Sequence, residues 1–208
     1  ATASNGTVVI NSDYTLSYTP NNNFNGTDTI TYTASDGTTT TTGTVTVTVT
    51  PINDAPTVAT AISDQAATED SAFSFTVPAT TFSDPDGDTL TYTATLSDGS
   101  DLPSWLSFNT STRVFSGTPL NANVGAITIK VTASDGSLTV SDSFVLTVAN
   151  TNDAPVTVAD SATTNEDTAV TIDVLANDSD PDGDTLSVTV ATASNGTVVI
   201  NSDYTLSY

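Results

Sequence analysis

The feature that most limits how this chain can fold is a regular alternation of apolar and hydroxyl-bearing residues. Residues 44–49 read Thr-Val-Thr-Val-Thr-Val, and residues 27–34, 89–94, 126–131 and 143–148 alternate in a similar way. Because successive side chains of a strand point to opposite faces, a period of two predicts β-strands with one apolar face. Asn-Gly and Asp-Gly pairs, which favour tight turns, lie between the runs. We find no convincing helical period, so the sequence predicts an all-β chain of β-sandwich domains.

The chain also repeats itself at two distances. Residues 1–18 are identical to residues 191–208, a spacing of 190. Inside that period four motifs recur in one order, spaced by 96 to 99 residues: ASDG at 34–37 and 133–136, NDAP at 53–56 and 152–155, ED at 69–70 and 166–167, and DPDGD at 84–88 and 180–184. A cloning duplication would explain the repeat at 190 residues but not the shorter one. Both repeats together predict a tandem array of domains of about 95 residues, in which two related types alternate.

The NDAP segments set the predicted domain boundaries, because proline keeps the residue before it extended and makes a short, stiff linker. We predict the C-terminal half of a repeat over residues 1–51, a complete domain over 52–152 and the N-terminal half of the next repeat over 153–208. On this interpretation the chain is a window on the array, and Thr19 of the next copy would follow Tyr208.

Composition excludes several classes of function. The net charge is −22, from 24 acidic and 2 basic residues, so the chain cannot neutralise a phosphate backbone and is unsuited to an anionic membrane surface. It has no Cys and no His, which excludes disulfides, thiolate metal sites and the commonest general base. Its longest apolar runs are far too short to span a membrane.

The acidic turns carry the most specific chemical signal. The DPDGD motif places Asp84, Asp86 and Asp88 at alternate positions of a tight turn, and its second copy does the same with Asp180, Asp182 and Asp184. Carboxylates this close repel one another by roughly 3 kcal/mol per pair at an effective dielectric constant near 20. With almost no Lys or Arg available, a hard cation is the natural partner, and oxygen ligands favour Ca²⁺ over Zn²⁺.

Other repeated polar residues could complete a ligand shell. They are the linker residues Asn53, Asp54, Asn152 and Asp153, the only two glutamates, Glu69 and Glu166, with Asp70 beside the first, and the ASDG aspartates Asp36 and Asp135. The alternative is that these are ordinary solvated turns, where Asp and Gly are the default residues. That alternative suits a single ASDG turn. The recurrence of all four motifs in register favours calcium binding.

Four motifs taken together resemble those of cadherin-like repeats. They are V-x-A-x-D-G, the D-x-D turn, the Asn-Asp-Ala-Pro linker and an early Glu. The complete domain resembles the dystroglycan-type cadherin-like group through LPSWLSFNTSTRVFSGTP at 102–119. The split domain resembles related cadherin-like tandem repeats through EDTAVTIDVLANDSDPDGDTLSV at 166–188 and YTPNNNFNGTDTITYTASDG at 18–37. Such repeats occur in large bacterial surface adhesins of the RTX type. The Asp-Arg-Glu motif of cadherins has no clear counterpart here.

The resemblance implies tandem Ig/cadherin-like Greek-key sandwiches with Ca²⁺ in the linkers between consecutive domains. At the second junction it implies ligands from Glu69, Asp70, Asn152, Asp153, Asp180, Asp182 and Asp184. At the first junction it implies Asn53, Asp54, Asp84, Asp86, Asp88 and Asp135, with a glutamate equivalent to Glu166 supplied from upstream. Asp36 would serve the junction that precedes its own domain.

These features predict a non-enzymatic, extracellular spacer of a surface adhesin or fibre, stiffened by calcium. A sandwich that binds a carbohydrate or protein ligand is the alternative, with Tyr18, Tyr32, Tyr92 and Trp105 as its aromatic candidates. Paired carboxylates could also serve a glycosidase, but metal ligation explains their place beside the linkers better. The expected partners are neighbouring repeats of the same polypeptide or head-to-tail copies of the chain, because residues 156–208 and 19–51 of another copy would rebuild one domain.

Overall fold

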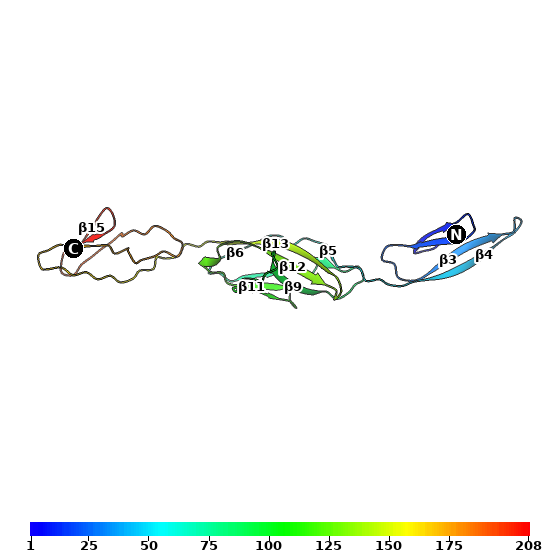
Figure 1. Cartoon of the computed structure of the whole chain (residues 1–208), viewed down its shortest axis with the longest axis horizontal. Coiled ribbons are helices and arrows are strands. Elements are labelled where there is room, and N and C mark those ends of the chain that lie inside the picture. The colour runs from blue at the N-terminus through cyan, green and yellow to red at the C-terminus, as the bar shows by residue number, and fades with distance from the viewer.

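The chain forms a row of three β-units. The computed structural model describes residues 1–208, and all its regular structure is β apart from one short 3-10 turn, η1 (Asn121–Asn123). Figure 1 shows the units following one another along a single long axis, with the termini in the two outer units. We call residues 1–51 the first unit, 52–152 the middle unit and 153–208 the last unit. No helix has the length and apolar character needed to cross a membrane.

The middle unit is a sandwich of two sheets. The larger sheet has the order β6 (Gln65–Thr68), β13 (Thr139–Ala149), β12 (Gly125–Ser134) and β9 (Thr91–Leu96), and only its β6–β13 pair is parallel. The smaller sheet is antiparallel, in the order β10 (Leu106–Asn109), β11 (Val114–Gly117) and β7 (Phe73–Thr76). A short pair, β5 (Thr57–Val58) with β8 (Phe82–Ser83), lies near the first linker.

The core of the middle unit follows the predicted alternation. In β12 the side chains of Ile129, Val131 and Ala133 are fully buried, and the residues between them are only partly covered. The Phe144 ring lies 5.7 Å from that of Phe115, its neighbour in the opposite sheet. This cluster of 13 buried apolar residues holds the two sheets together. Trp105 lies half-buried against it, as expected for a residue at the rim of the core.

The first unit consists of two hairpins, β1 (Gly6–Ile10) with β2 (Leu16–Pro20) and β3 (Gly26–Ser35) with β4 (Thr40–Val49). Its only buried residues are Asp28 and Ile30, both in β3. The alternating Val side chains of β4 are less covered than the pattern predicts, and Val45 is 40 % exposed. The long β3–β4 hairpin faces only the shorter β1–β2 hairpin, so much of its apolar face has nothing to pack against.

The last unit has the fewest strands, β14 (Thr171–Ile172), β15 (Val199–Ile200) and β16 (Leu206–Ser207), in the order β14-β16-β15. No residue of 153–208 is buried. The last unit therefore has neighbouring strands but no closed core, and only the middle unit is a complete sandwich.

Candidate metal centres at the two junctions

Both DPDGD motifs fold into the same tight turn. In the first, Asp84 Oδ1 accepts hydrogen bonds from the amides of Asp86 at 2.9 Å and Asp88 at 3.2 Å. In the second, Asp180 Oδ1 accepts the equivalent bonds at 2.9 and 3.3 Å. Gly87 and Gly183 have φ values of 81° and 78°, which non-glycine residues rarely adopt. The first carboxylate of each motif thus shapes the turn and leaves the middle one free to reach the linker.

The middle carboxylate of each turn accepts a hydrogen bond from the linker that precedes its unit. Asp86 Oδ2 accepts a hydrogen bond from the Asp54 amide at 2.7 Å, and Asp182 Oδ2 accepts one from the Asp153 amide at 2.6 Å. Hydrogen bonds to an ionised acceptor are shorter and stronger than neutral ones. Each linker is therefore attached to the unit that follows it, by the same contact at both junctions.

At the second junction, carboxylates from three parts of the chain converge. Glu69 comes from the end of β6, Asp153 from the linker and Asp182 from the acidic turn, and one oxygen of each lies within 4.8 Å of the others. Glu69 is only 1 % exposed. Its Oε1 accepts a hydrogen bond from the Thr151 amide, and its Oε2 is buried with no hydrogen-bond partner. Asn121, in η1, donates a hydrogen bond to Asp182 Oδ1 at 3.0 Å.

These three side chains fit a divalent cation. A buried carboxylate oxygen without a partner is costly, and three adjacent carboxylates repel one another. A bound cation would satisfy the buried Glu69 oxygen and offset the repulsion, and carboxylate and carbonyl oxygens are the ligands that Ca²⁺ prefers. The basic side chains do not supply this charge: Arg113, for example, lies over the Tyr92 ring, 5.5 Å from its centre.

A hollow of about 280 Å³ lies beside the same junction. Its polar wall includes the predicted residues Asn152, Asp153, Asp180 and Asp184, and also Asp178. Asp178 was not predicted, and it accepts a hydrogen bond from the Val158 amide at 2.7 Å. The second junction therefore has further oxygen atoms, next to the three converging carboxylates, that could serve as ligands.

The first junction has a related but smaller set of contacts. Asn53 donates a hydrogen bond to Asp135 Oδ2 at 3.0 Å, so the linker is joined to the β12–β13 turn. The amides of Leu138 and Ser137, with help from Asn53, hold the pKa of Asp135 below its ordinary value. Asp84 Oδ2 is buried and has no partner. Neither of the two glutamates, Glu69 and Glu166, belongs to this junction, and the expectation that a glutamate comes from upstream stays a prediction.

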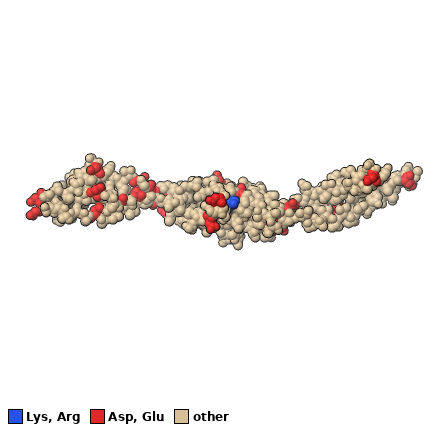
Figure 2. All heavy atoms as spheres, in the orientation of Figure 1, with Lys and Arg blue, Asp and Glu red and all other residues tan.

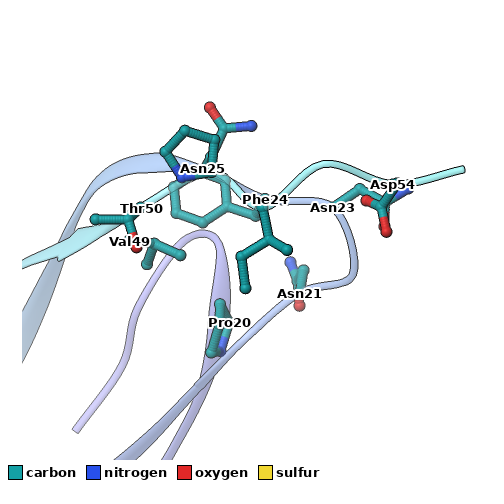
Figure 3. A pocket seen from close by; sticks show the side chains of 10 residues that line it. Pro20, Asn21, Asn23, Phe24, Asn25, Val49, Thr50 and Asp54 are labelled. Carbon is teal, nitrogen blue, oxygen red and sulfur yellow. The ribbon is translucent and has the colours of Figure 1, made fainter. Parts of the chain in front are cut away.

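The first junction also borders a hollow of about 280 Å³ that is lined by the Asn-rich loop after β2. Figure 3 shows the side chains of Asn23 and Asp54 toward the linker, with Val49 and Phe24 nearer the strands. The loop asparagines were not among the predicted ligands. They offer amide oxygens beside the linker carboxylate, and the run Asn21-Asn22-Asn23 was the only sequence signal for them.

Several predicted ligands lie outside these clusters. Asp70 is exposed in a left-handed conformation, its amide donates to the Pro119 carbonyl, and its carboxylate is not part of the Glu69 cluster. Asp88 is exposed, with no hydrogen bond to its carboxylate. Glu166 is exposed in the last unit. Asp36 lies at the tip of the β3–β4 hairpin, where the amides of Thr39 and Thr38 lower its pKa.

Asp28 is a buried acidic residue that was not singled out from the sequence. It is 3 % exposed, and it accepts hydrogen bonds from the Tyr18 hydroxyl at 2.8 Å and the Asn5 and Ser4 amides at 2.9 and 3.4 Å. Burial raises its pKa, but the donors together outweigh burial and the pKa is lowered. Burial and the bond to Asp28 raise the pKa of Tyr18. This carboxylate joins the two hairpins of the first unit and, with these donors, needs no metal.

Figure 2 shows acidic side chains at both junctions, toward the two ends of the molecule and beside the one small basic patch on the middle unit. The net charge of −22 is therefore spread along the row, and part of it lies where the units meet. A cation at a junction would reduce repulsion between neighbouring units.

Three family models match consecutive parts of the chain. Residues 1–51 match a bacterial cadherin-like domain, residues 55–149 a family described as "Putative Ig domain", and residues 152–208 a bacterial Ig domain. The match over the middle unit is to an Ig family, and its likeness to the dystroglycan-type group stays a prediction. No curated protein matches the chain.

Solved structures with some likeness include an endo-fucoidan hydrolase of glycoside hydrolase family 107, which is 25 % identical with a TM-score of 0.41. That match covers 73 % of this chain and 23 % of the hydrolase, so the chain spans under a quarter of its length. The human desmocollin-1 ectodomain is 17 % identical with a TM-score of 0.39, and the match covers 98 % of this chain and 42 % of desmocollin-1. Titin domain M7 is 20 % identical with a TM-score of 0.33, over 47 % of this chain and 97 % of titin M7.

At these TM-scores none of the three structures decides what this chain does. The Ig and cadherin-like families that match it are typically non-catalytic and suggest a surface or extracellular protein. Together with the all-β architecture, the three family matches support a chain built of tandem Ig- and cadherin-like β-sandwich repeats.

Proposed function

We propose that the chain is a spacer segment of a long extracellular adhesin or surface fibre, in which Ca²⁺ bound between consecutive units stiffens the row. The observation that carries this proposal is the second junction. There Glu69 of the middle unit, Asp153 of the linker and Asp182 of the last unit offer oxygens within 4.8 Å of one another. One ion bound to all three would restrict the angle between the two units.

The buried oxygen of Glu69 supports a role for the ion in stability as well as in geometry. Extracellular calcium modules have Kd values of about 10⁻⁴–10⁻³ M, which corresponds to roughly 4–5.5 kcal/mol of binding free energy. A small domain has an unfolding free energy of about 5–15 kcal/mol. Calcium at this affinity would therefore contribute a sizeable part of the stability of the units it joins.

The elongated row of units suits a spacer (Figure 1). The repeat of residues 1–18 at 191–208 also favours one, because a spacer gains length by adding copies and needs no variety among them. The adhesin or fibre that would contain the segment is part of the proposal, and it rests on the matched repeat families and their suggested surface location.

Thermal unfolding and small-angle X-ray scattering of the 208-residue chain, each in excess CaCl₂ and in EGTA, test the proposal. At 10 mM CaCl₂ the affinity range above gives about 1.5–3 kcal/mol of stabilisation. For a domain of this size we expect Tm to rise by roughly 5–20 °C. The maximum particle dimension should also increase, with a smaller spread of inter-unit angles. A Tm and a scattering profile that are both unchanged by calcium would overturn the proposal.

A further inference from the structure

One hydrogen bond joins the middle and last units directly. The side-chain amide of Asn121, in η1 of the middle unit, donates to Asp182 Oδ1 of the last unit at 3.0 Å, and both side chains are half-buried. Apart from a bond between the linker neighbours Asn152 and Asp153, no other hydrogen bond links the middle unit with the last. The two units therefore share a polar contact that depends only on the side chains of the protein itself.

The position of Asn121 is fixed by the turn in which it lies. Its carbonyl accepts a hydrogen bond from the Val124 amide at 3.1 Å, which closes η1. Pro119, which precedes η1, is fully buried, and its carbonyl accepts a bond from the Asp70 amide at 2.8 Å. That bond attaches η1 to the segment that carries Glu69. Asn121 and Glu69 therefore approach the last unit from one firmly held surface of the middle unit.

The acceptor, Asp182, is held from both sides. Its Oδ1 accepts the bond from Asn121, and its Oδ2 accepts the bond from the Asp153 amide at 2.6 Å. The Asp180 carboxylate fixes the backbone of the same turn by accepting a bond from the Asp182 amide at 2.9 Å. An ionised carboxylate has about four lone-pair sites on its two oxygens. Both bonds to Asp182 can therefore persist when the same carboxylate binds an ion.

We propose that Asn121 is a positioning residue that keeps the middle and last units in one orientation without calcium. A hydrogen bond to an ionised acceptor is stronger than one between neutral groups, and this bond ties the two units together beyond the linker. Asn121 also holds Asp182 where the ion would bind, and this second role rests on the proposed function. Calcium then binds a junction that is already assembled, so little apparent affinity is lost in assembling it.

The repeat supplies a matched position without this contact. Asn22 stands 99 residues before Asn121, which is the spacing of the NDAP and ASDG motifs, and each of the two lies two residues after a Thr-Pro pair. Asn22 is exposed and makes no hydrogen bond. A substitution of Asn22 therefore controls for the loss of an asparagine from this type of loop without the loss of a bond between units.

Residual dipolar couplings, measured by NMR in EGTA, test the calcium-free role. Couplings from the middle and last units of the 208-residue chain should fit one common alignment in the wild type. In Asn121→Ala they should require two alignments, with smaller couplings in the last unit, because the units then reorient independently. Asn22→Ala should keep the common alignment. Amide chemical shifts away from the junction should be unchanged in both variants, which shows that the units remain folded.

Asn121→Asp reverses the chemistry of the contact at the same side-chain size. In EGTA a carboxylate at this position repels Asp182, so the common alignment should be lost. In saturating calcium the carboxylate becomes an additional oxygen ligand, and the common alignment should return. An asparagine that only stabilised its own turn would give no such difference between the two conditions.

Calcium titrations followed by the NMR signal of the Asp153 amide test the second role. Asn121→Ala should raise the calcium concentration at the midpoint about three- to ten-fold, because only a part of the calcium-free molecules then has the junction assembled. Asn22→Ala should leave this midpoint unchanged. An unchanged midpoint in Asn121→Ala would show that Asn121 does not position Asp182 for the ion.

Independent alignment of the two units in the wild-type chain in EGTA would overturn the proposal, as would a common alignment that survives in Asn121→Ala. Equal losses of alignment in Asn121→Ala and Asn22→Ala would overturn it too, because the effect would not be specific to the bond with Asp182. A wild-type chain with a common alignment in EGTA and no response to calcium would instead contradict the proposed function and leave the calcium-free contact standing. The two proposals can therefore fail separately.

Discussion

The amide of Asp153 donates a hydrogen bond to Asp182 Oδ2 at 2.6 Å, which joins the second linker to the unit that follows it. The Asp54 amide makes the equivalent bond to Asp86 at the first linker. At the second junction the preceding unit also reaches the linker, through Glu69. The two junctions therefore share one contact with the following unit and differ in the contribution from the preceding unit.

The first prediction concerns the glutamate of the second junction. Glu69→Gln should abolish most of the calcium-dependent rise in Tm, because it removes the charge of a buried ligand. In EGTA the Tm should be unchanged or higher, because the repulsion between Glu69 and the neighbouring carboxylates is relieved. The matched control is Glu166→Gln, at the equivalent position of the last unit, where the side chain is exposed. Thermal unfolding with and without calcium measures both variants. An equal effect of the two would contradict a specific role for Glu69.

The two junctions should respond separately to changes in their acidic turns. Asp182→Asn should weaken calcium binding at the second junction by about ten-fold or more, because a charged ligand is lost, and Asp86→Asn should act only at the first. Calcium titrations followed by the NMR signals of the Asp153 and Asp54 amides distinguish the sites. If either variant shifted both titrations equally, the junctions would be coupled and the prediction would be wrong.

Asp28 should make the first unit sensitive to acid. Its pKa is lowered from the ordinary value of 3.8, so its contribution to stability is complete above pH 3.8 and is lost as the pH falls through the lower value of the folded state. We expect hydrogen exchange of the Ser4 and Asn5 amides to accelerate over this range. Asp28→Asn should remove most of that dependence.

Other aspartates with lowered pKa values also titrate in this range, and Asp36 is the nearest match, on the same hairpin. Asp36→Asn should leave the exchange of the Ser4 and Asn5 amides unchanged, because its carboxylate bonds only to Thr38 and Thr39. Acid sensitivity at Ser4 that survived in Asp28→Asn would show that another group controls the contact.

A glycine in the middle unit should tolerate no side chain. A Cβ at Gly117 would lie 1.9 Å from the Trp105 carbonyl oxygen, which is backbone directly before β10 and cannot move without shifting the start of that strand. We expect Gly117→Ala to lower the free energy of unfolding by about 2–4 kcal/mol, the range of severe overpacking. Ser116→Ala, at the exposed neighbour, should cost under about 1 kcal/mol. Denaturant unfolding of the chain, followed by the fluorescence of Trp105 in the middle unit, measures both variants.

The strands could be predicted from the sequence because alternation is a local property. Thr44 to Val49 lie within β4, and Ile127 to Val131 lie within β12. Burial was harder to predict, since the same alternation gives a buried Val131 and a Val45 that is 40 % exposed. What decides the difference is whether a second sheet covers the strand, and the pattern of one strand contains no information about that.

The candidate site, like the fold, could be predicted only in part from the sequence. The acidic turns and linkers were predictable because Asp182 and Asp153 belong to short repeated motifs. Asn121 was not predictable, because it lies in a 3-10 turn that carries no motif. Its hydrogen bond to Asp182 joins residues that are 61 positions apart in the sequence. Asp28 did leave a signal, an acidic residue on the strand face that also carries Ile30, but only the structure shows the donors that make it favourable there.

The arrangement of the units on one axis has a mechanical consequence. A pulling force along the row passes through each linker in turn, with no second path around it (Figure 1). Links loaded in series extend by the sum of their extensions and fail at the weakest one. Added copies would thus lengthen such a row without raising the force at which it yields, and that force would depend on the least secured unit or linker.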